Sequence, residues 1–488
     1  MDLKKISLFL LTLALPFCLG VLFLQGSQLL TQYSSHVYLV SFMAIAGLIL
    51  FGIGLILKSR EYFFFLYMGY FPFYSIYQAR LNATIAFAVL FIFIYRSKLL
   101  DFFKNKKSHF HRPFYLLVLS LFISLLNSQY RLEAFAQAIQ YLSYIIVLLS
   151  FFTEIDSFKK LKTAYHILMA MVILGGMMSV IQIFFGIETN RIFTYNLGFN
   201  TISKSGFLRY PSIFIDAQTA ALFFSVTGIL LGGYFSVVQK NFKWNFFFMA
   251  WGTFFLLLTG TRIAYAGFLL SLFIFTFNKT QKVVSLIVLA LVFALFAIWS
   301  IGISFPFMSS IDTDRFTIYN LLKSVETRLE FWGNGLITFL NNPLGSGLGA
   351  SNLYAAAVKS NLTGHGIGYL QENIAQFESA FFDISCSLGY IGLVGILWLL
   401  GYFFYLGRLL YKKRDEIPLL EFSRYLMGAM SCFIICCLTA PVNRQDSVKF
   451  LFIFLLGSMF YLYITYLSKQ IKRIPFQRPK CNYEQAVR

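Results

Sequence analysis

The chain is a series of apolar runs, most of them long enough to cross a lipid bilayer as a helix. Of its 488 residues, 58% are hydrophobic and only 12% are charged, which is far from the composition of a soluble domain. Backbone groups left unpaired in lipid are too costly for irregular structure, and a run of about 20 apolar residues favours a helix. We therefore predict an all-α fold, a polytopic membrane helix bundle of about 12 to 14 transmembrane helices.

The candidate spans share high hydropathy and few charges. They are Ser7–Leu24, Val37–Leu57, Tyr62–Tyr77, Ala83–Tyr95, Phe114–Leu126, Ala134–Phe152, Ala164–Phe185, Ser212–Val238, Trp244–Leu258, Ile263–Phe277, Val283–Ile303, Ala380–Leu410, Phe422–Ala440 and Val448–Leu467. The first run follows two lysines like a secretory signal, but it has spanning length and no small-x-small cleavage site follows it. We interpret it as a retained helix.

Basic residues predict the orientation of the bundle. The formal charge of +20 suggests nucleic acid at first, but the Lys and Arg residues lie in short loops between apolar runs. Because such residues are retained on the cytoplasmic side, this distribution indicates membrane topology and argues against a nucleic-acid partner. With the N-terminus inside, the basic loops Arg96–Arg112 and Arg408–Arg414 are cytoplasmic, and both termini are cytoplasmic in an inner bacterial membrane.

Two connections, 186–211 and 304–379, are longer than a minimal bundle needs, and this topology places both outside. In the second, Val325, Leu329, Trp332, Leu336 and Leu340 recur at helical spacing, with Glu326, Glu330, Asn334 and Thr338 opposite. This pattern predicts an amphipathic helix on the outer membrane surface. We divide the chain into N-terminal helices (1–185), a core with both loops (186–410), and C-terminal helices with a basic tail (411–488).

Three arginines break the topological bias because they lie on the outer side. Arg209 precedes a span, Arg262 closes the turn TGTR, and Arg328 lies in the amphipathic segment. The planar guanidinium group binds phosphate oxygens in pairs, so three of them at one face are a candidate pyrophosphate site. The alternative is that each caps a helix or extends to lipid headgroups.

Carboxylates near the same face are candidate general bases. Glu378 is the first choice, because a carboxylate in a partly apolar setting has a raised pKa and accepts a proton from a sugar hydroxyl. It also fits a simple helix start, where acidic residues favour the helix dipole. Asp216, Asp383 and His365 are weaker candidates. The run GSGLG lacks a preceding strand and reads as a turn, and no cysteine pattern indicates a disulfide or a metal site.

Three motifs together resemble the O-antigen ligase and polymerase superfamily over about Arg209 to Leu410. They are the turn TGTR, the run RLEFWGNGLITFLNNPLGSGLG, and the segment ESAFFDISCSLGYIGL with its Gly-x-x-Gly pair. Ligases of that superfamily typically place His-Asn about ten residues before the glycine pair. Here Glu378-Ser379 lies eleven residues ahead of Gly389, which favours the polymerase branch. Against it, neither outer loop carries the Arg-x10-Gly pattern of some polymerases.

The resemblance implies metal-independent glycosyl transfer on the outer face of the cytoplasmic membrane, without a cofactor. The donor is a glycan on undecaprenyl pyrophosphate, and the acceptor is a second lipid-linked repeat unit of O-antigen, capsule or exopolysaccharide. In this reading the three arginines hold the pyrophosphate and Glu378 is the base. Membrane lipids and a chain-length regulator are the other expected partners. The alternatives are an O-antigen ligase, which transfers glycan to lipid A core, and a lipid-linked oligosaccharide flippase, which needs charges at span centres.

Overall fold

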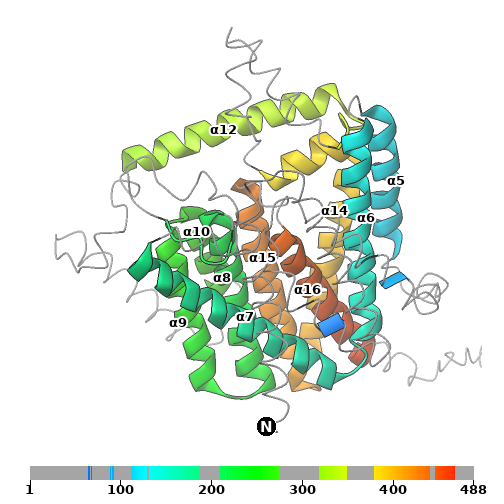
Figure 1. Ribbon diagram of the computed structural model, residues 1–488. Helices are drawn as coiled ribbons and strands as arrows, with labels where there is room; N and C mark the ends of the chain where they lie inside the picture. Colours follow the sequence, from blue (N-terminus) through cyan, green and yellow to red (C-terminus); the bar gives the residue numbers. More distant parts are fainter. Residues whose placement is uncertain are drawn as a thin grey trace, which may run out of the picture.

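The structure of the protein, a computed structural model, is a bundle of helices over the residues it describes (Figure 1). These are residues 64–65, 68, 88, 91–92, 111–128, 131–186, 209–214, 216–273, 318–348, 379–439 and 446–467. Within those ranges no strand occurs, so the predicted all-α class is confirmed. Five predicted spans lie wholly or mostly outside these residues. They are Ser7–Leu24, Val37–Leu57, Tyr62–Tyr77, Ala83–Tyr95 and Val283–Ile303.

The longer elements follow the predicted order along the chain: all but α12 correspond to predicted spans, and α12 corresponds to the predicted amphipathic helix. They are α5 (His111–Asn127), α6 (Arg131–Glu154), α7 (Phe158–Phe185), α8 (Ala217–Gly233), α9 (Phe242–Thr259), α10 (Arg262–Ser271), α12 (Ile318–Asn341), α14 (Ala380–Lys412), α15 (Phe422–Thr439) and α16 (Asp446–Leu462). Short helical turns follow α8 (η3, Tyr234–Val238), precede α15 (η7, Pro418–Glu421) and follow α16 (η9, Tyr463–Leu467). Five of the described helical segments are long and apolar enough to cross a membrane. The protein is therefore a multi-pass membrane protein.

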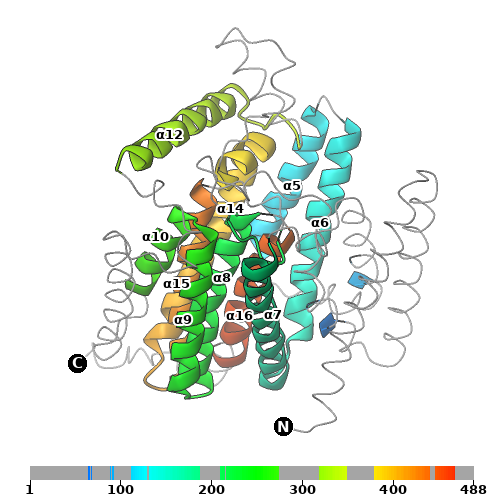
Figure 2. The ribbon, with the colours of Figure 1, turned by 60° about the vertical axis from the view of Figure 1, so that its left-hand side comes forward.

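Helix α8 forms the centre of the bundle and contacts α7, α9, α10, α15 and α16 (Figures 1 and 2). Its sequence is apolar on all sides, which is typical of a helix surrounded by others. Nearly every residue of it is buried. Outer helices instead turn large apolar side chains outward, such as Phe184 and Phe185 of α7. These exposed faces fit a lipid surround.

Small residues allow α8 and α9 to lie close together. The Cα atom of Gly228 lies 3.1 Å from the position that a Cβ atom at Gly252 would take, and the carbonyl oxygen of Phe224 lies 2.9 Å from it. Helices in membranes typically associate through glycines that allow close backbone approach, because the hydrophobic effect contributes little to helix association in lipid.

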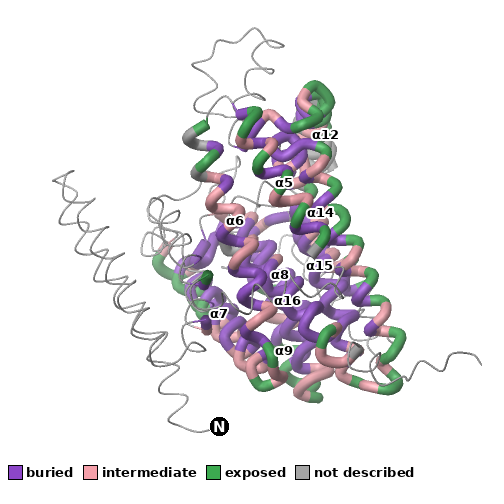
Figure 3. Tube along the Cα trace, turned by 90° about the vertical axis from the view of Figure 1, so that its right-hand side faces the viewer, coloured by how far each residue is buried: buried purple, intermediate pink, exposed green. Residues whose placement is uncertain are grey.

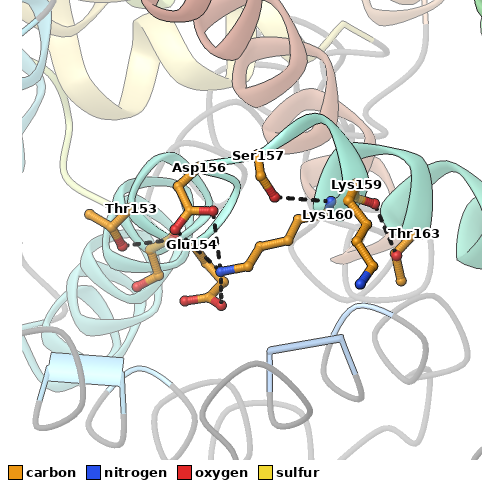
Figure 4. Close-up of polar contacts among 8 residues, drawn as sticks. Thr153, Glu154, Asp156, Ser157, Lys159, Lys160 and Thr163 are labelled. Carbon is orange, nitrogen blue, oxygen red and sulfur yellow. Dashed lines mark hydrogen bonds and ion pairs between the residues drawn. The ribbon is translucent and has the colours of Figure 1, made fainter.

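The turn between α6 and α7 is fixed by charged and capping contacts (Figure 4). Lys160 Nζ lies 3.0 Å from Glu154 Oε1 and 3.3 Å from Asp156. Ser157 is the N-cap of α7, and its hydroxyl accepts a hydrogen bond from the Lys160 amide at 3.4 Å. Glu154 is almost fully buried, so its pairing with Lys160 offsets the cost of removing that charge from water.

The predicted span Ser212–Val238 is wrong at its beginning. The helix starts only at Ala217, because Asp216 is its N-cap and accepts a hydrogen bond from the Thr219 amide at 2.7 Å. Pro211 and Ser212, whose φ is 58°, belong to a turn instead. Apolar residues extend the hydropathy signal beyond the helix, but the capping residue sets the boundary.

Helix α12 lies across one end of the bundle, as all three ribbon and tube views show (Figures 1, 2 and 3). Its predicted apolar residues Leu329, Leu336 and Leu340 are exposed, Leu329 to 58%. Thr338 was predicted on the polar face, and this is wrong. It is fully buried, because the helix packs on the bundle through the side that carries Gly335, Thr338 and Phe339.

The predicted span Ala380–Leu410 corresponds to one helix with a break. Gly389 has φ 65° and ψ −166°, which is not helical. In Figure 1 the part of α14 before the break lies along α12, and the part after it descends through the bundle. The crossing part therefore begins near Gly389, and the first turns of α14 lie at the same end as α12.

Candidate functional site

The site is built at the end of the bundle where α12 lies, from two groups of residues. The first group joins Arg209–Phe214, the segment that precedes α8, to the TGTR turn between α9 and α10. Arg209 is 6% exposed. Its Nε donates to the Thr259 carbonyl at 2.9 Å, and its second terminal nitrogen donates to Thr261 Oγ1 at 2.6 Å. Sequence positions 50 residues apart are thus joined by one guanidinium group.

The turn itself has the geometry that its sequence requires. Gly260 has φ 60° and ψ 25°, the left-handed conformation that glycine adopts at little cost at the end of a helix. Thr261 follows as the N-cap of α10, and its hydroxyl donates to the Ala217 carbonyl at 3.3 Å. The turn is therefore tied to Arg209 on one side and to the start of α8 on the other.

A second set of bonds holds the same segment against α7. The Gln182 side chain donates from Nε2 to the Ser212 carbonyl at 2.7 Å and accepts from the Ser212 amide at 2.9 Å. The Ser212 hydroxyl donates to the Gly175 carbonyl at 2.6 Å. Residues far apart in sequence thus converge on the approach to α8, which the sequence alone did not reveal.

The structure brings together some of the site residues that the sequence predicts for this first group. Arg209, Asp216 and the backbone of Arg262 lie in one small region, because Thr261 contacts both Arg209 and Ala217. The structure does not describe the Arg262 side chain, so the position of its guanidinium group stays a prediction. Asp216 lies before α8 as its cap and not within the span, which favours a structural role for it.

The second group joins the loop after α12 to the break in α14. In an unbroken helix the Tyr390 amide would donate to the Cys386 carbonyl. Here the Tyr390 amide donates to the Pro343 carbonyl at 2.9 Å. The Cys386 carbonyl accepts from the amide and the hydroxyl of Ser346 at 2.8 and 3.0 Å. The loop therefore pairs the backbone groups that the break exposes.

Glycines make this contact possible. A Cβ atom at Gly389 would lie 2.5 Å from the Pro343 carbonyl oxygen, and one at Gly345 would lie 2.5 Å from the Ser387 carbonyl oxygen. Both glycines also have positive φ. Ser124 of α5 completes the arrangement by donating to the Ser387 carbonyl at 2.8 Å. We call this contact the glycine interlock (Asn342–Gly347 with Cys386–Tyr390). The described part of GSGLG, Gly345–Leu348, is non-helical, as the sequence predicts.

Arg328 and Asp383 belong to the second group. Asp383 is buried in the first turn of α14, and Arg328 is partly buried two turns before Gly335 on the side of α12 that faces the bundle. The exposed leucines Leu329, Leu336 and Leu340 lie on another side of α12. Glu378 and His365 lie outside the described residues, although Ser379, the next residue after Glu378, is described.

Lys449 is a basic residue that the sequence analysis missed. It lies in the first turn of α16, with Nζ 4.3 Å from the centre of the Tyr144 ring and 5.5 Å from that of Tyr141. Tyr141 in turn packs against a cluster that includes Leu348 and Leu388, next to the glycine interlock. The available signal was a lysine just inside the predicted outer end of an apolar run, since such residues are costly in lipid.

Comparison with known proteins adds a family likeness to this geometry. Residues 246–397 match the O-antigen ligase family. The matched segment contains the TGTR turn, α12, the glycine interlock and the break in α14, so the predicted resemblance is confirmed. No protein of curated function matches the chain. Arg209 precedes the matched segment but binds directly to a turn inside it.

The family likeness supports a membrane enzyme of the O-antigen ligase and polymerase type. Such enzymes act on lipid-linked glycans within the membrane. Two of the motifs on which the resemblance was based, the Asn-Pro-Leu-Gly-Ser-Gly run and the Gly-x-x-Gly pair, are in contact through the glycine interlock. Backbone packing thus explains Gly345 and Gly389, which leaves the charged residues beside them as candidates for chemistry.

Proposed function

We propose that the protein polymerises undecaprenyl-pyrophosphate-linked oligosaccharide repeat units on the outer face of the cytoplasmic membrane. The observation that carries the proposal is that Glu378-Ser379 stands where ligases of this superfamily have His-Asn, directly before the first turn of α14. A carboxylate at this position is suited to take a proton from an acceptor hydroxyl.

In this reaction a hydroxyl of one lipid-linked repeat unit attacks the reducing-end sugar carbon of the donor. The bond from that carbon to the pyrophosphate oxygen breaks, and undecaprenyl pyrophosphate leaves with the bonding electrons. Glu378 takes the proton of the hydroxyl. Arg262 and Arg328 bind the pyrophosphate and offset its growing charge, and Arg209 adds its charge while it holds the turn that carries Arg262.

Two substitutions test the residue roles. Arg262→Ala and Glu378→Gln are each expected to abolish long glycan, because one removes a phosphate ligand and the other removes the base. Membrane insertion, measured by the amount of chain in washed membranes, should be unchanged. Arg131→Ala, at an exposed position at the start of α6, is the matched control. Polymer of ordinary length from either site variant would show that its assigned role is wrong.

The glycan of a deletion strain tests the reaction type. A lost polymerase leaves single repeat units on the usual acceptor, whereas a lost ligase leaves full-length polymer on undecaprenyl pyrophosphate. We expect the first result. The second would assign the chain to the ligase alternative. Among the described spans, buried charged residues lie near helix ends rather than at span centres, which does not favour a flippase.

A further inference from the structure

The first turns of α14 run beside α12 in the same direction and in register. The rings of Trp332 and Phe382 have their centres 6.4 Å apart, and those of Phe339 and Tyr390 are 4.4 Å apart. Between these pairs, the Cys386 thiol donates to the Gly335 carbonyl at 3.3 Å. Each contact joins residues that are about fifty positions apart in the chain.

This register places Ser379 level with Arg328 and one turn before Phe382. Trp332 follows Arg328 by one turn of α12, and it contacts Phe382. Ser379, Trp332 and Arg328 are therefore neighbours across the interface between the two helices, at the amino end of α14. Glu378, the proposed base, directly precedes Ser379 in sequence.

Ser379 and Trp332 each carry a buried hydrogen-bond donor in this small region. In the part of the chain that the structure describes, Ser379 Oγ and Trp332 Nε1 are both buried and have no hydrogen-bond partner. Ser379 is 1% exposed and is the N-cap of α14, yet its side chain makes no capping bond. Buried polar groups are nearly always paired, so two such donors on facing helices indicate an acceptor that comes from elsewhere.

The surrounding residues select the kind of ligand. A phosphate would suit the two donors, the helix N-terminus and the neighbouring Arg328. The buried carboxylate of Asp383 lies one turn further along α14 and disfavours a second negative charge there, so we place the pyrophosphate on the arginines and its attached sugar at Ser379 and Trp332. A sugar ring has hydroxyl oxygens that accept from Ser379 and Trp332, other hydroxyls that donate to a carboxylate, and an apolar face that packs on aromatic rings.

We propose that Ser379 and Trp332 form a sugar-binding subsite beside the proposed base, in which both donate hydrogen bonds to glycan hydroxyl oxygens. This rests on the proposed function in so far as the glycan is lipid-linked. The subsite holds the sugar portion of the substrate, whereas the arginines bind its pyrophosphate. Ser379 and Trp332 thus position the ring at the amino end of α14, next in sequence to Glu378.

Trp332→Phe and Ser379→Ala test the subsite, because each removes the donor and keeps most of the side-chain volume. The purified full chain in nanodiscs is titrated with two probes: the lipid-linked repeat unit extracted from the deletion strain, and undecaprenyl pyrophosphate alone. We expect each variant to bind the repeat unit about tenfold more weakly and to bind undecaprenyl pyrophosphate as the wild type does. Trp398→Phe, at an exposed tryptophan of α14, is the matched control.

Thermal unfolding separates the subsite from a structural role. Since neither donor has a partner within the described protein, removing it should leave the melting temperature unchanged or higher while affinity falls. Unchanged affinity for the repeat unit would overturn the proposal. An equal loss for both probes would assign the donors to pyrophosphate and overturn it also. A ligase phenotype of the deletion strain would refute only the polymerase assignment, because both reactions move a glycan.

Discussion

Arg209 illustrates how the role of one residue depends on its bonds. From sequence it was a candidate for pyrophosphate binding or for a helix-end contact. The structure buries it and directs two of its donors to Thr259 and Thr261. A guanidinium group held in this way stabilises the turn that carries Arg262, whether or not it also binds a phosphate group of the substrate.

We expect Arg209→Lys to destabilise the protein by about 1.5–3 kcal/mol, because an ammonium group cannot reproduce both charge-assisted bonds of the guanidinium group. The measurement is the thermal unfolding of the detergent-purified chain, followed by circular dichroism. Arg131→Lys, at an exposed arginine, should leave the transition where it is. If Arg209→Lys unfolded like the wild type, the bonds to the turn would contribute no stability.

Helix α14 shows how a break is stabilised at the scale of an element. A break in a membrane helix exposes backbone groups that lipid cannot satisfy. The glycine interlock supplies their partners from the loop after α12 and from Ser124 of α5. The first turns of α14 are thereby free to follow α12 and not the axis of the span.

Gly389→Ala is therefore expected to be strongly destabilising, on the order of 3 kcal/mol, from an unfavourable φ and from overlap with the loop. Its Cβ atom would lie 2.4 Å from the carbonyl carbon of Leu344. Gly401→Ala on the same helix is the control, because a Cβ atom there meets nothing within 4 Å. Both variants are compared by thermal unfolding and by polymer yield. Equal behaviour of the two would show that the interlock does not require glycine.

At the scale of the whole molecule, the polar residues of interest gather at one end. The turn between α8 and α9 lies at the other end of these helices, so the start of α8 and the end of α9 lie at the end that α12 covers (Figures 1 and 2). The Arg209 group and the α12–α14 group therefore face the same side. The positive-inside distribution predicts that this side is exoplasmic.

Cysteine labelling tests this orientation. A membrane-impermeant maleimide added to intact spheroplasts should modify Glu326→Cys on α12, and should modify Asp415→Cys in the turn after α14 only after the membrane is permeabilised. Both positions are exposed, so access to the reagent and not burial decides the result. The chain without either substitution is the control, because it shows how much label its native cysteines take up. The opposite pattern would place the proposed site in the cytosol, where an exoplasmic polymerase reaction is not feasible.

Much of the bundle followed from the sequence because lipid permits few structures. Spans such as Ala164–Phe185 and Phe422–Ala440 were located by hydropathy, and the described helices α7 and α15 contain or nearly match them. The amphipathic helix was also identified from its spacing. The start of α8 was missed, since apolar residues continued beyond the cap.

The sequence by itself determined the helical membrane fold and the likeness of its second half to O-antigen ligases and polymerases, because hydropathy and short motifs are local properties. Only the tertiary structure decided that Arg209 binds the TGTR turn, that two glycine motifs meet across the break in α14, and that Trp332 lies beside Phe382. These contacts join residues about fifty positions apart, and nothing local in the sequence specifies which residues meet. They depend on how the helices pack.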